Sequence, residues 1–199
     1  MIERLFSQNA AWATAKTRED PQFFSRLATL QAPKYMWIGC SDSRVSADVI
    51  TGLQPGEIFV HRNVANLAHP ADLNYLSVLQ FAVEVLKVEH IIICGHYGCG
   101  GVRAAMERDQ HGLIDNWLQP IRDIAMRNRP ELDGIANENE KLMRLCELNV
   151  QAQVRRVSEA TPVQDAWHRG QQLSVHGWVY GLADGLLRSL NVTRTGLEP

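Results

Sequence analysis

Two stretches decide the fold of this 199-residue chain: Tyr35-Met36-Trp37-Ile38-Gly39-Cys40-Ser41-Asp42-Ser43-Arg44 and Ile91-Ile92-Ile93-Cys94-Gly95-His96-Tyr97-Gly98-Cys99. Each begins with a short apolar run typical of a buried strand, and each continues into side chains that can bind a metal ion. Binding sites in open α/β sheets assemble at the ends of strands. The two stretches therefore predict two strands whose ends build one site.

The polar residues of these stretches form a possible four-ligand set for zinc. Cys40 and Asp42 are two positions apart, and His96 and Cys99 are three positions apart, a spacing that fits one turn. Two thiolates, an imidazole and a carboxylate are all ligands that zinc accepts. A structural zinc site and two unrelated turns are the alternatives, but the repeated strand-end context favours a metal site. Arg44 offers the carboxylate a second partner, which favours a catalytic centre over a structural ion pair.

The composition describes an ordinary soluble protein and excludes several classes. The hydrophobic fraction is 45%, the charged fraction is 21% and the formal net charge is −2, so nothing predicts binding to nucleic acid or to an anionic membrane. No apolar stretch approaches the ~20 residues of a membrane span. The start of the chain lacks the pattern of a signal peptide, so we expect a cytoplasmic protein.

The four cysteines do not predict a disulfide framework in a chain of this length. Cys40 and Cys99 are metal-ligand candidates. Cys94 lies inside an apolar run and Cys146 on a helical pattern, so we expect both to be packed as small hydrophobic side chains.

The order of predicted elements indicates an α/β fold. Strands are predicted at 34–39, 57–61, 90–95 and 173–180, with 185–190 pairing with the last of them as a hairpin. Helices are predicted at 2–16, after Pro21, after Ser46, from Asp72 through Leu86, at 101–108, 113–128 and 136–159, and from Thr161. This alternation predicts a Rossmann-like, mostly parallel sheet with an antiparallel edge strand, helices on both faces and an N-terminal helical arm.

The motifs Cys40-Ser-Asp-Ser-Arg44 and His96-Tyr-Gly-Cys-Gly-Gly101 resemble those of the β-class carbonic anhydrases. The resemblance extends from Gln31 to Tyr180. It implies one domain over residues 1–199, with residues 1–30 as a helical dimerisation arm. It also implies an intertwined homodimer that often forms a dimer of dimers, and the reversible hydration of carbon dioxide to bicarbonate and a proton.

The resemblance also implies roles for individual residues. Cys40, His96 and Cys99 would be the permanent Zn²⁺ ligands, and Asp42 and Arg44 a catalytic dyad in which Asp42 switches between zinc and Arg44. The implied substrate pocket has four members, of which one hydrogen-bonds substrate across the dimer interface, two make the wall apolar and one offers a backbone N–H: Gln31, Phe59, Val64 and Gly100. Plant-like members carry a tyrosine on the helix before the third strand, and residues 81–85 have none.

A further resemblance concerns regulation. In a bacterial subgroup of the family, a tryptophan, an arginine and a tyrosine bind a regulatory bicarbonate that favours aspartate on the zinc. Trp37, Arg62 and Tyr180 occupy these contexts, and Gly39 and Val45 also resemble that subgroup. The alternative is that the two aromatic residues belong to the core and Arg62 to a structural pair.

The chemistry predicts a preference for alkaline pH. Zinc makes a nucleophile by lowering the pKa of bound water. Two thiolates donate more charge to the metal than neutral histidines do, so we expect a less acidic water than in a site with three histidine ligands. No other histidine is placed to be a proton shuttle.

Two other functions remain open on the sequence alone. One is hydrolysis of carbon disulfide or carbonyl sulfide at the same site. The other is a non-catalytic module that binds zinc or bicarbonate, against which the Asp42–Arg44 pair argues, because a closed structural site needs no second partner for its fourth ligand.

Overall fold

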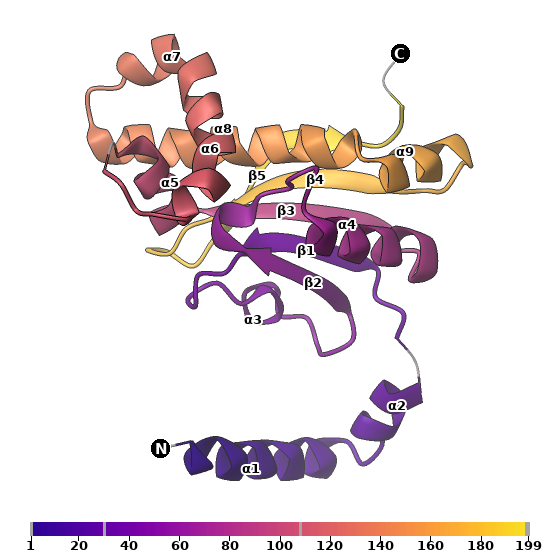
Figure 1. The fold of residues 1–199 in the computed structure, drawn as a ribbon. Coiled ribbons are helices and arrows are strands. Elements are labelled where there is room, and N and C mark those ends of the chain that lie inside the picture. The colour runs from indigo at the N-terminus through magenta and orange to yellow at the C-terminus, as the bar shows by residue number, and fades with distance from the viewer. Residues whose placement is uncertain (1, 30, 108, 198–199) are drawn as a thin grey trace. The chain divides into compact units, whose positions relative to one another are not determined.

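The computed structural model describes residues 2–29, 31–107 and 109–197. The chain forms two compact units, Met1–Ala32 and Pro33–Pro199, and each is described by itself (Figure 1). The prediction of one functional domain over residues 1–199 stays a prediction.

The first unit consists of two helices, α1 (Glu3–Glu19) and α2 (Phe23–Thr29), and α1 extends three residues beyond the predicted end at 16. Neither helix buries a residue within the described chain. Trp12 of α1 packs edge-on against Phe23 and Phe24, with ring centroids 6.3 and 5.6 Å apart. Other large apolar side chains of this unit are exposed to solvent: Ile2, Leu5 and Phe6. The unit therefore folds back on itself but keeps an unburied apolar surface.

The second unit is built on a five-stranded sheet of order β2-β1-β3-β4-β5. Its strands are β1 (Tyr35–Cys40), β2 (Ile58–Asn63), β3 (His90–His96), β4 (Ser174–Tyr180) and β5 (Leu187–Arg194). The first four in this order are parallel, and β5 pairs antiparallel with β4 at the edge. The predicted fold class is confirmed.

The two central strands are buried on both faces, which explains their continuous apolar sequences. On one face, Met36, Ile38 and Ile93 pack in the main core with the helices α4 (Leu73–Gln80), α8 (Glu138–Ser158) and α9 (Thr161–His168). On the other face, Trp37 and Ile92 pack beside the short helix α3 (Ala47–Thr51). Helices therefore cover both faces unequally, as Figure 1 shows.

The long helix α8 (Glu138–Ser158) lies along the sheet and contacts β3, β4 and β5. The other helices described in this unit are α4 (Leu73–Gln80), α5 (Gly100–Met106), α6 (Ile114–Arg127), α7 (Arg129–Asp133) and α9 (Thr161–His168), together with the 3₁₀ turn η1 (Val64–Asn66). The predicted helix over 113–128 is followed directly by α7, because Pro130 starts a new helix at its first turn.

The predicted regular helix from Asp72 through Leu86 is wrong in its second half. Asp72 caps α4 as expected by accepting a hydrogen bond from the N–H of Asn74. Residues Phe81–Val85 then form a π-helix, η2, in which the N–H of Leu86 donates to the carbonyl of Phe81. This wider turn keeps Ala82 and Val83 fully buried in the core.

Candidate metal centre

Two neighbouring parallel strands bring the predicted ligands together. Cys40 is the last residue of β1, His96 is the last residue of β3, and Cys99 precedes the first residue of α5. Their ligand atoms all lie within 4.8 Å of one another, and all three residues are buried. The two sulfur atoms are 3.8 Å apart. The structure thus brings Cys40, His96 and Cys99 together near the ends of two neighbouring strands, as the sequence predicts.

The imidazole of His96 is oriented as a metal ligand would be. Its Nδ1 lies 3.1 Å from the carbonyl oxygen of Tyr97, to which it can donate. That bond leaves the lone pair on Nε2, and Nε2 is buried without a hydrogen-bond partner. An unpaired buried nitrogen beside two sulfur atoms is costly unless a further group completes it. The donor set fits Zn²⁺.

The thiols of Cys40 and Cys99 influence each other strongly. The hydrogen bond from Cys99 lowers the pKa of Cys40, and the same contact raises the pKa of Cys99. Without a metal ion the pair therefore favours a single negative charge. Burial raises the pKa of Cys94, and it raises that of Cys146 to about 12. Both lie in apolar clusters and outside the ligand set.

Asp42 lies in the turn after β1, between Arg44 and the ligand set. Its Oδ1 accepts from Arg44 Nε at 2.9 Å, and its Oδ2 accepts from Arg44 Nη2 at 2.6 Å. The same Oδ2 is 3.7 Å from His96 Nε2. The Arg44 guanidinium is the main reason why the pKa of Asp42 lies well below its usual range. The carboxylate is therefore ionised, held by a bidentate contact, and close to the three ligand atoms.

The predicted substrate-pocket residues do not all gather at one place. Val64 packs in the same cluster as Cys40 and Cys99, and Gly100 begins α5 beside them. Phe59 packs with the main core, and its ring lies 5.8 Å from that of Phe81. Gln31 belongs to the first unit, so its position relative to the metal set is not defined.

The predicted regulatory residues lie on the face of the sheet that carries α3. Trp37 is buried and shares its cluster with Tyr180. A Cβ on Gly39 would lie 2.2 Å from Trp37 Nε1, so glycine leaves space for the indole. Arg62 Nε donates to the carbonyl of Cys40 at 2.9 Å, and its Nη2 donates to the carbonyl of Asp42 at 2.5 Å. Arg62 thus holds the backbone of the turn that carries Asp42.

Three residues near the site were not predicted from the sequence to contribute to it: Ala65, Asn149 and Gln153. The turn after β2 contains Ala65, and its carbonyl accepts a hydrogen bond from Asn149 of α8. Asn149 and Gln153 are buried polar residues four positions apart on a helix face that is otherwise apolar. Two amides that interrupt an apolar helix face could have indicated a buried polar contact, because buried amides need specific hydrogen-bond partners.

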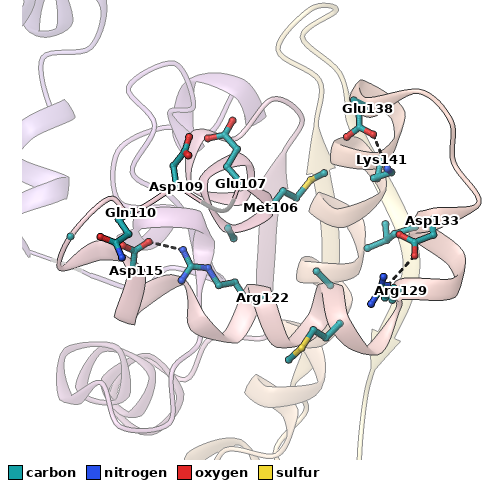
Figure 2. Close-up of a pocket in the computed structure, with 15 residues that line it drawn as sticks. Met106, Glu107, Asp109, Gln110, Asp115, Arg122, Arg129, Asp133, Glu138 and Lys141 are labelled. Atoms are coloured by element: carbon teal, nitrogen blue, oxygen red, sulfur yellow. Dashed lines mark hydrogen bonds and ion pairs between the residues drawn. The ribbon is translucent and has the colours of Figure 1, made fainter.

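A hollow of about 1090 Å³ lies away from the metal set, between α5, α6, α7 and α8. Figure 2 shows that charged side chains around it pair with one another, as Asp115 does with Arg122 and Glu138 with Lys141. None of the predicted site residues lines it. Ion pairs with arginine or lysine hold three of the five carboxylates that line it, those of Asp115, Asp133 and Glu138, and neither histidine nor cysteine is among its lining residues.

Among residues 2–29, 31–107 and 109–197, no helix combines the length and the apolar character that crossing a membrane requires. The family model described as carbonic anhydrase matches residues 35–187. A carbonic anhydrase of Emericella nidulans is 46% identical over 98% of this chain and 86% of its own length.

Two sets of solved structures share the fold of the whole chain. Tetrameric β-carbonic anhydrases of Sordaria macrospora include a chain with a TM-score of 0.93 and 39% identity, covering 98% of both chains. The Coccomyxa β-carbonic anhydrase in complex with acetazolamide has a TM-score of 0.95 and 40% identity, covering 98% of this chain and 89% of that one. The assignment to the bacterial bicarbonate-regulated subgroup stays a prediction, since the Emericella and Sordaria relatives are fungal. The chain belongs to the β-class carbonic anhydrase family, a family of enzymes.

Proposed function

We propose that this protein catalyses the reversible hydration of carbon dioxide to bicarbonate and a proton, with Zn²⁺ held by Cys40, His96 and Cys99. One observation carries the proposal. The unpaired Nε2 of His96 faces two buried sulfur atoms, and the Asp42–Arg44 pair lies directly beside them. Family membership supports the same reaction.

The residues around the ligand set have distinct tasks in this reaction. Bound there, Zn²⁺ would supply a Lewis acid that lowers the pKa of water. Asp42 is ionised and can accept a hydrogen bond from the attacking water, which orients it. Arg44 keeps that carboxylate in place through two parallel bonds. Val64 supplies an apolar surface beside the sulfur atoms, which suits an uncharged substrate.

Asp42 also acts as a gate in this proposal, either paired with Arg44 or bound as the fourth zinc ligand. The short distance of 3.7 Å between its Oδ2 and His96 Nε2 supports this role, because a small rearrangement brings the carboxylate to the ligand set. We call the state with Asp42 paired to Arg44 the open form and the state with Asp42 on zinc the closed form. Activating a water molecule requires the release of a proton, whereas binding an ionised carboxylate does not, so low pH favours the closed form.

Regulation by bicarbonate at Trp37, Arg62 and Tyr180 would act on the same turn. In this structure Arg62 donates hydrogen bonds to the carbonyls of Cys40 and Asp42, so an anion that pairs with Arg62 competes with those bonds. The anion shifts the equilibrium only if it binds the closed form better than the open form.

We further propose a homo-oligomeric assembly and a cytoplasmic location. The exposed Leu5 and Phe6 of α1 favour a homodimer built through the N-terminal arm, and the tetrameric relatives favour a dimer of dimers. Free cysteines at all four positions suit a reducing, cytoplasmic location.

The decisive experiment is a stopped-flow measurement of carbon dioxide hydration across pH 6.5 to 9.5, with the zinc content measured on the same preparation. We expect one zinc per chain, a rate that rises toward alkaline pH, and inhibition by acetazolamide. Added bicarbonate at constant pH and ionic strength should lower the rate if the gate is regulated. Turnover of carbon disulfide without hydration of carbon dioxide would refute the proposed reaction.

A further inference from the structure

A further hollow, of about 450 Å³, adjoins the candidate metal centre, because Arg44 is one of the residues that line it. Its other walls come from the turn after β3, from α5 and the first turns of α8, and from the loop between β4 and β5. Four apolar side chains line it: Leu142, Met143, Leu182 and Ala183. Sites for small molecules usually measure about 300–1,000 Å³ and combine apolar walls with a few polar groups. The hollow has this size and this mixed character.

Arg103 gives the hollow a positive charge that no carboxylate neutralises. The side chain lies on α5 and is exposed, and no carboxylate of residues 2–29, 31–107 and 109–197 forms an ion pair with it. Glu107 and Glu138 line a smaller neighbouring hollow together with Arg103. Glu138 pairs with Lys141, however, and Glu107 Oε2 lies 3.9 Å from His111 Nε2. Arg103 can therefore bind an anion from outside the chain.

Arg44 gives the hollow a second positive charge, which depends on the position of Asp42. Nε and Nη2 of Arg44 donate to the Asp42 carboxylate, whereas Nη1 donates to no residue in the described part of the chain. The remaining arginine of the hollow, Arg188, pairs with Asp184, so those two charges cancel. In the open form Asp42 neutralises Arg44. In the closed form Asp42 has left, and Arg44 adds its charge to that of Arg103.

We propose that this hollow is an inhibitory site for a small monocarboxylate with a short apolar tail, whose carboxylate binds Arg103 and Arg44. The inference rests on the gate of the proposed function. When Asp42 moves to the metal, the carboxylate of the bound ligand replaces it as the partner of Arg44. The ligand therefore binds the closed form better than the open form, and this differential affinity moves the gate toward the closed form.

The lining of the hollow selects this class of ligand. Guanidinium groups bind carboxylates through charge-assisted hydrogen bonds, often two at a time. The apolar side chains of Leu142, Met143 and Leu182 cannot solvate a second charged group, but they can cover a short hydrocarbon tail. Each buried methylene strengthens binding by up to about fourfold. We therefore expect affinity to rise from formate to acetate to butyrate by about two- to fourfold for each added methylene.

The first test measures the Kd of butyrate for the zinc-loaded protein by isothermal titration calorimetry at constant pH and ionic strength. Arg103→Gln should weaken binding about tenfold or more, because it removes hydrogen bonds from a charged donor. Met143→Glu should also weaken it, because the new carboxylate repels the ligand from the wall. Arg127→Gln is the control, since Arg127 is also exposed but lines a different hollow. Its Kd should stay within about twofold of the wild-type value.

The second test examines the link to the gate. Asp42→Asn leaves Arg44 without an ionised partner, so butyrate should bind this variant about fivefold or more tightly than it binds the wild type, at the lower end of usual coupling between sites. Inhibition of hydration by butyrate, relative to the rate of each variant without butyrate, should weaken in Arg103→Gln. Azide binds the metal directly, so its inhibition should not depend on Arg103.

Two results would overturn the proposal. Wild-type affinity for butyrate in both Arg103→Gln and Met143→Glu would mean that butyrate binds elsewhere, with the metal as the obvious alternative. Unchanged affinity in Asp42→Asn would exclude the coupling between the hollow and the gate. Calorimetry needs no turnover. Absence of hydration activity in the zinc-loaded wild type would therefore refute the proposed function separately, whatever the affinity for butyrate.

Discussion

Two turns meet at Cys40, and they are held in opposite ways. The turn after β1 (41–46) is held by charged groups: Arg44 pairs with Asp42, and Arg62 binds the carbonyls of Cys40 and Asp42. The turn after β2 (63–68) is held by neutral amides from inside the protein. The two backbones are joined where the N–H of Ser41 donates to the carbonyl of Asn63 at 2.8 Å.

The difference in solvent exposure indicates which turn can move. The Arg44 side chain is 60% exposed, so water can replace its bonds, and pairs of this kind contribute only about 0–1 kcal/mol to stability. A buried amide that loses its partner costs about 1–3 kcal/mol. The first turn is suited to switching and the second to staying in place. Four predictions test this difference between the two turns.

The largest effect is expected where both turns converge. Cys40→Ser removes a ligand atom, so the protein should lose most of its zinc, and activity should fall further than the roughly 100-fold upper range for residues that only support a ligand. Metal analysis and stopped-flow hydration measure the two losses. Cys94→Ala is the matched control, because Cys94 is equally buried but packs beside Trp37. Full zinc occupancy in Cys40→Ser would contradict the assignment.

Breaking the first turn should affect activity without affecting stability. Arg44→Ala should keep its zinc and lower the hydration rate by about 100-fold, within the range for a lost acid–base function. The pKa of Asp42 should rise toward its ordinary value of about 4, which leaves the carboxylate ionised at neutral pH. The loss must then come from its position, and Arg44→Lys should recover only part of the rate. Wild-type activity at alkaline pH in Arg44→Ala would exclude the gate.

Relieving the second turn should be tolerated unusually well. Ala65→Gly loses one buried methyl group but removes a left-handed strain of about 1–2 kcal/mol. Ala166→Gly loses an equally buried methyl group inside α9 and adds a helix penalty of about 1 kcal/mol. Urea unfolding should therefore show Ala65→Gly as the less damaged variant by about 2 kcal/mol. Equal losses would mean that the turn is not strained.

The smallest effect is expected at a contact between two histidine side chains, His90 and His176, which lie outside both turns. His176 Nε2 lies 3.1 Å from His90 Nδ1, and burial, followed by the charge of His90, lowers the pKa of His176. The unfolded chain, with a pKa near 6.5, then binds more protons than the folded one. This contribution is fully present above that value and is lost as the pH falls through it toward the lower folded pKa.

His176→Gln should therefore flatten the fall in unfolding free energy between pH 7 and 5, by less than about 1 kcal/mol because solvent screens the site. Urea unfolding at several pH values measures it, with the exposed His168→Gln as control. Zinc content should not change. A steeper slope in His176→Gln would reverse the assigned direction of the pKa shift.

The sheet and the ligand set could be predicted because both are written in local patterns. Apolar runs mark β1 and β3, and the residues that end them must reach the same edge of a parallel sheet. The second half of the helix after Asp72 could not be predicted as a π-helix, since the burial of Ala82 and Val83 depends on the core around them. The short helix α7, which contains Pro130, was not predicted, because a proline can end one helix or begin the next.

The amino-acid sequence by itself determined which side chains can bind the metal, since ligand type and strand position follow from the order of residues. Only the tertiary structure decided what surrounds them. It directs Arg62 to the carbonyls of Cys40 and Asp42, and it places Asn149 against a peptide 84 positions earlier in the chain. Such contacts leave no periodic trace in the sequence, because each depends on where a distant helix or strand packs, and packing is set by the whole core at once.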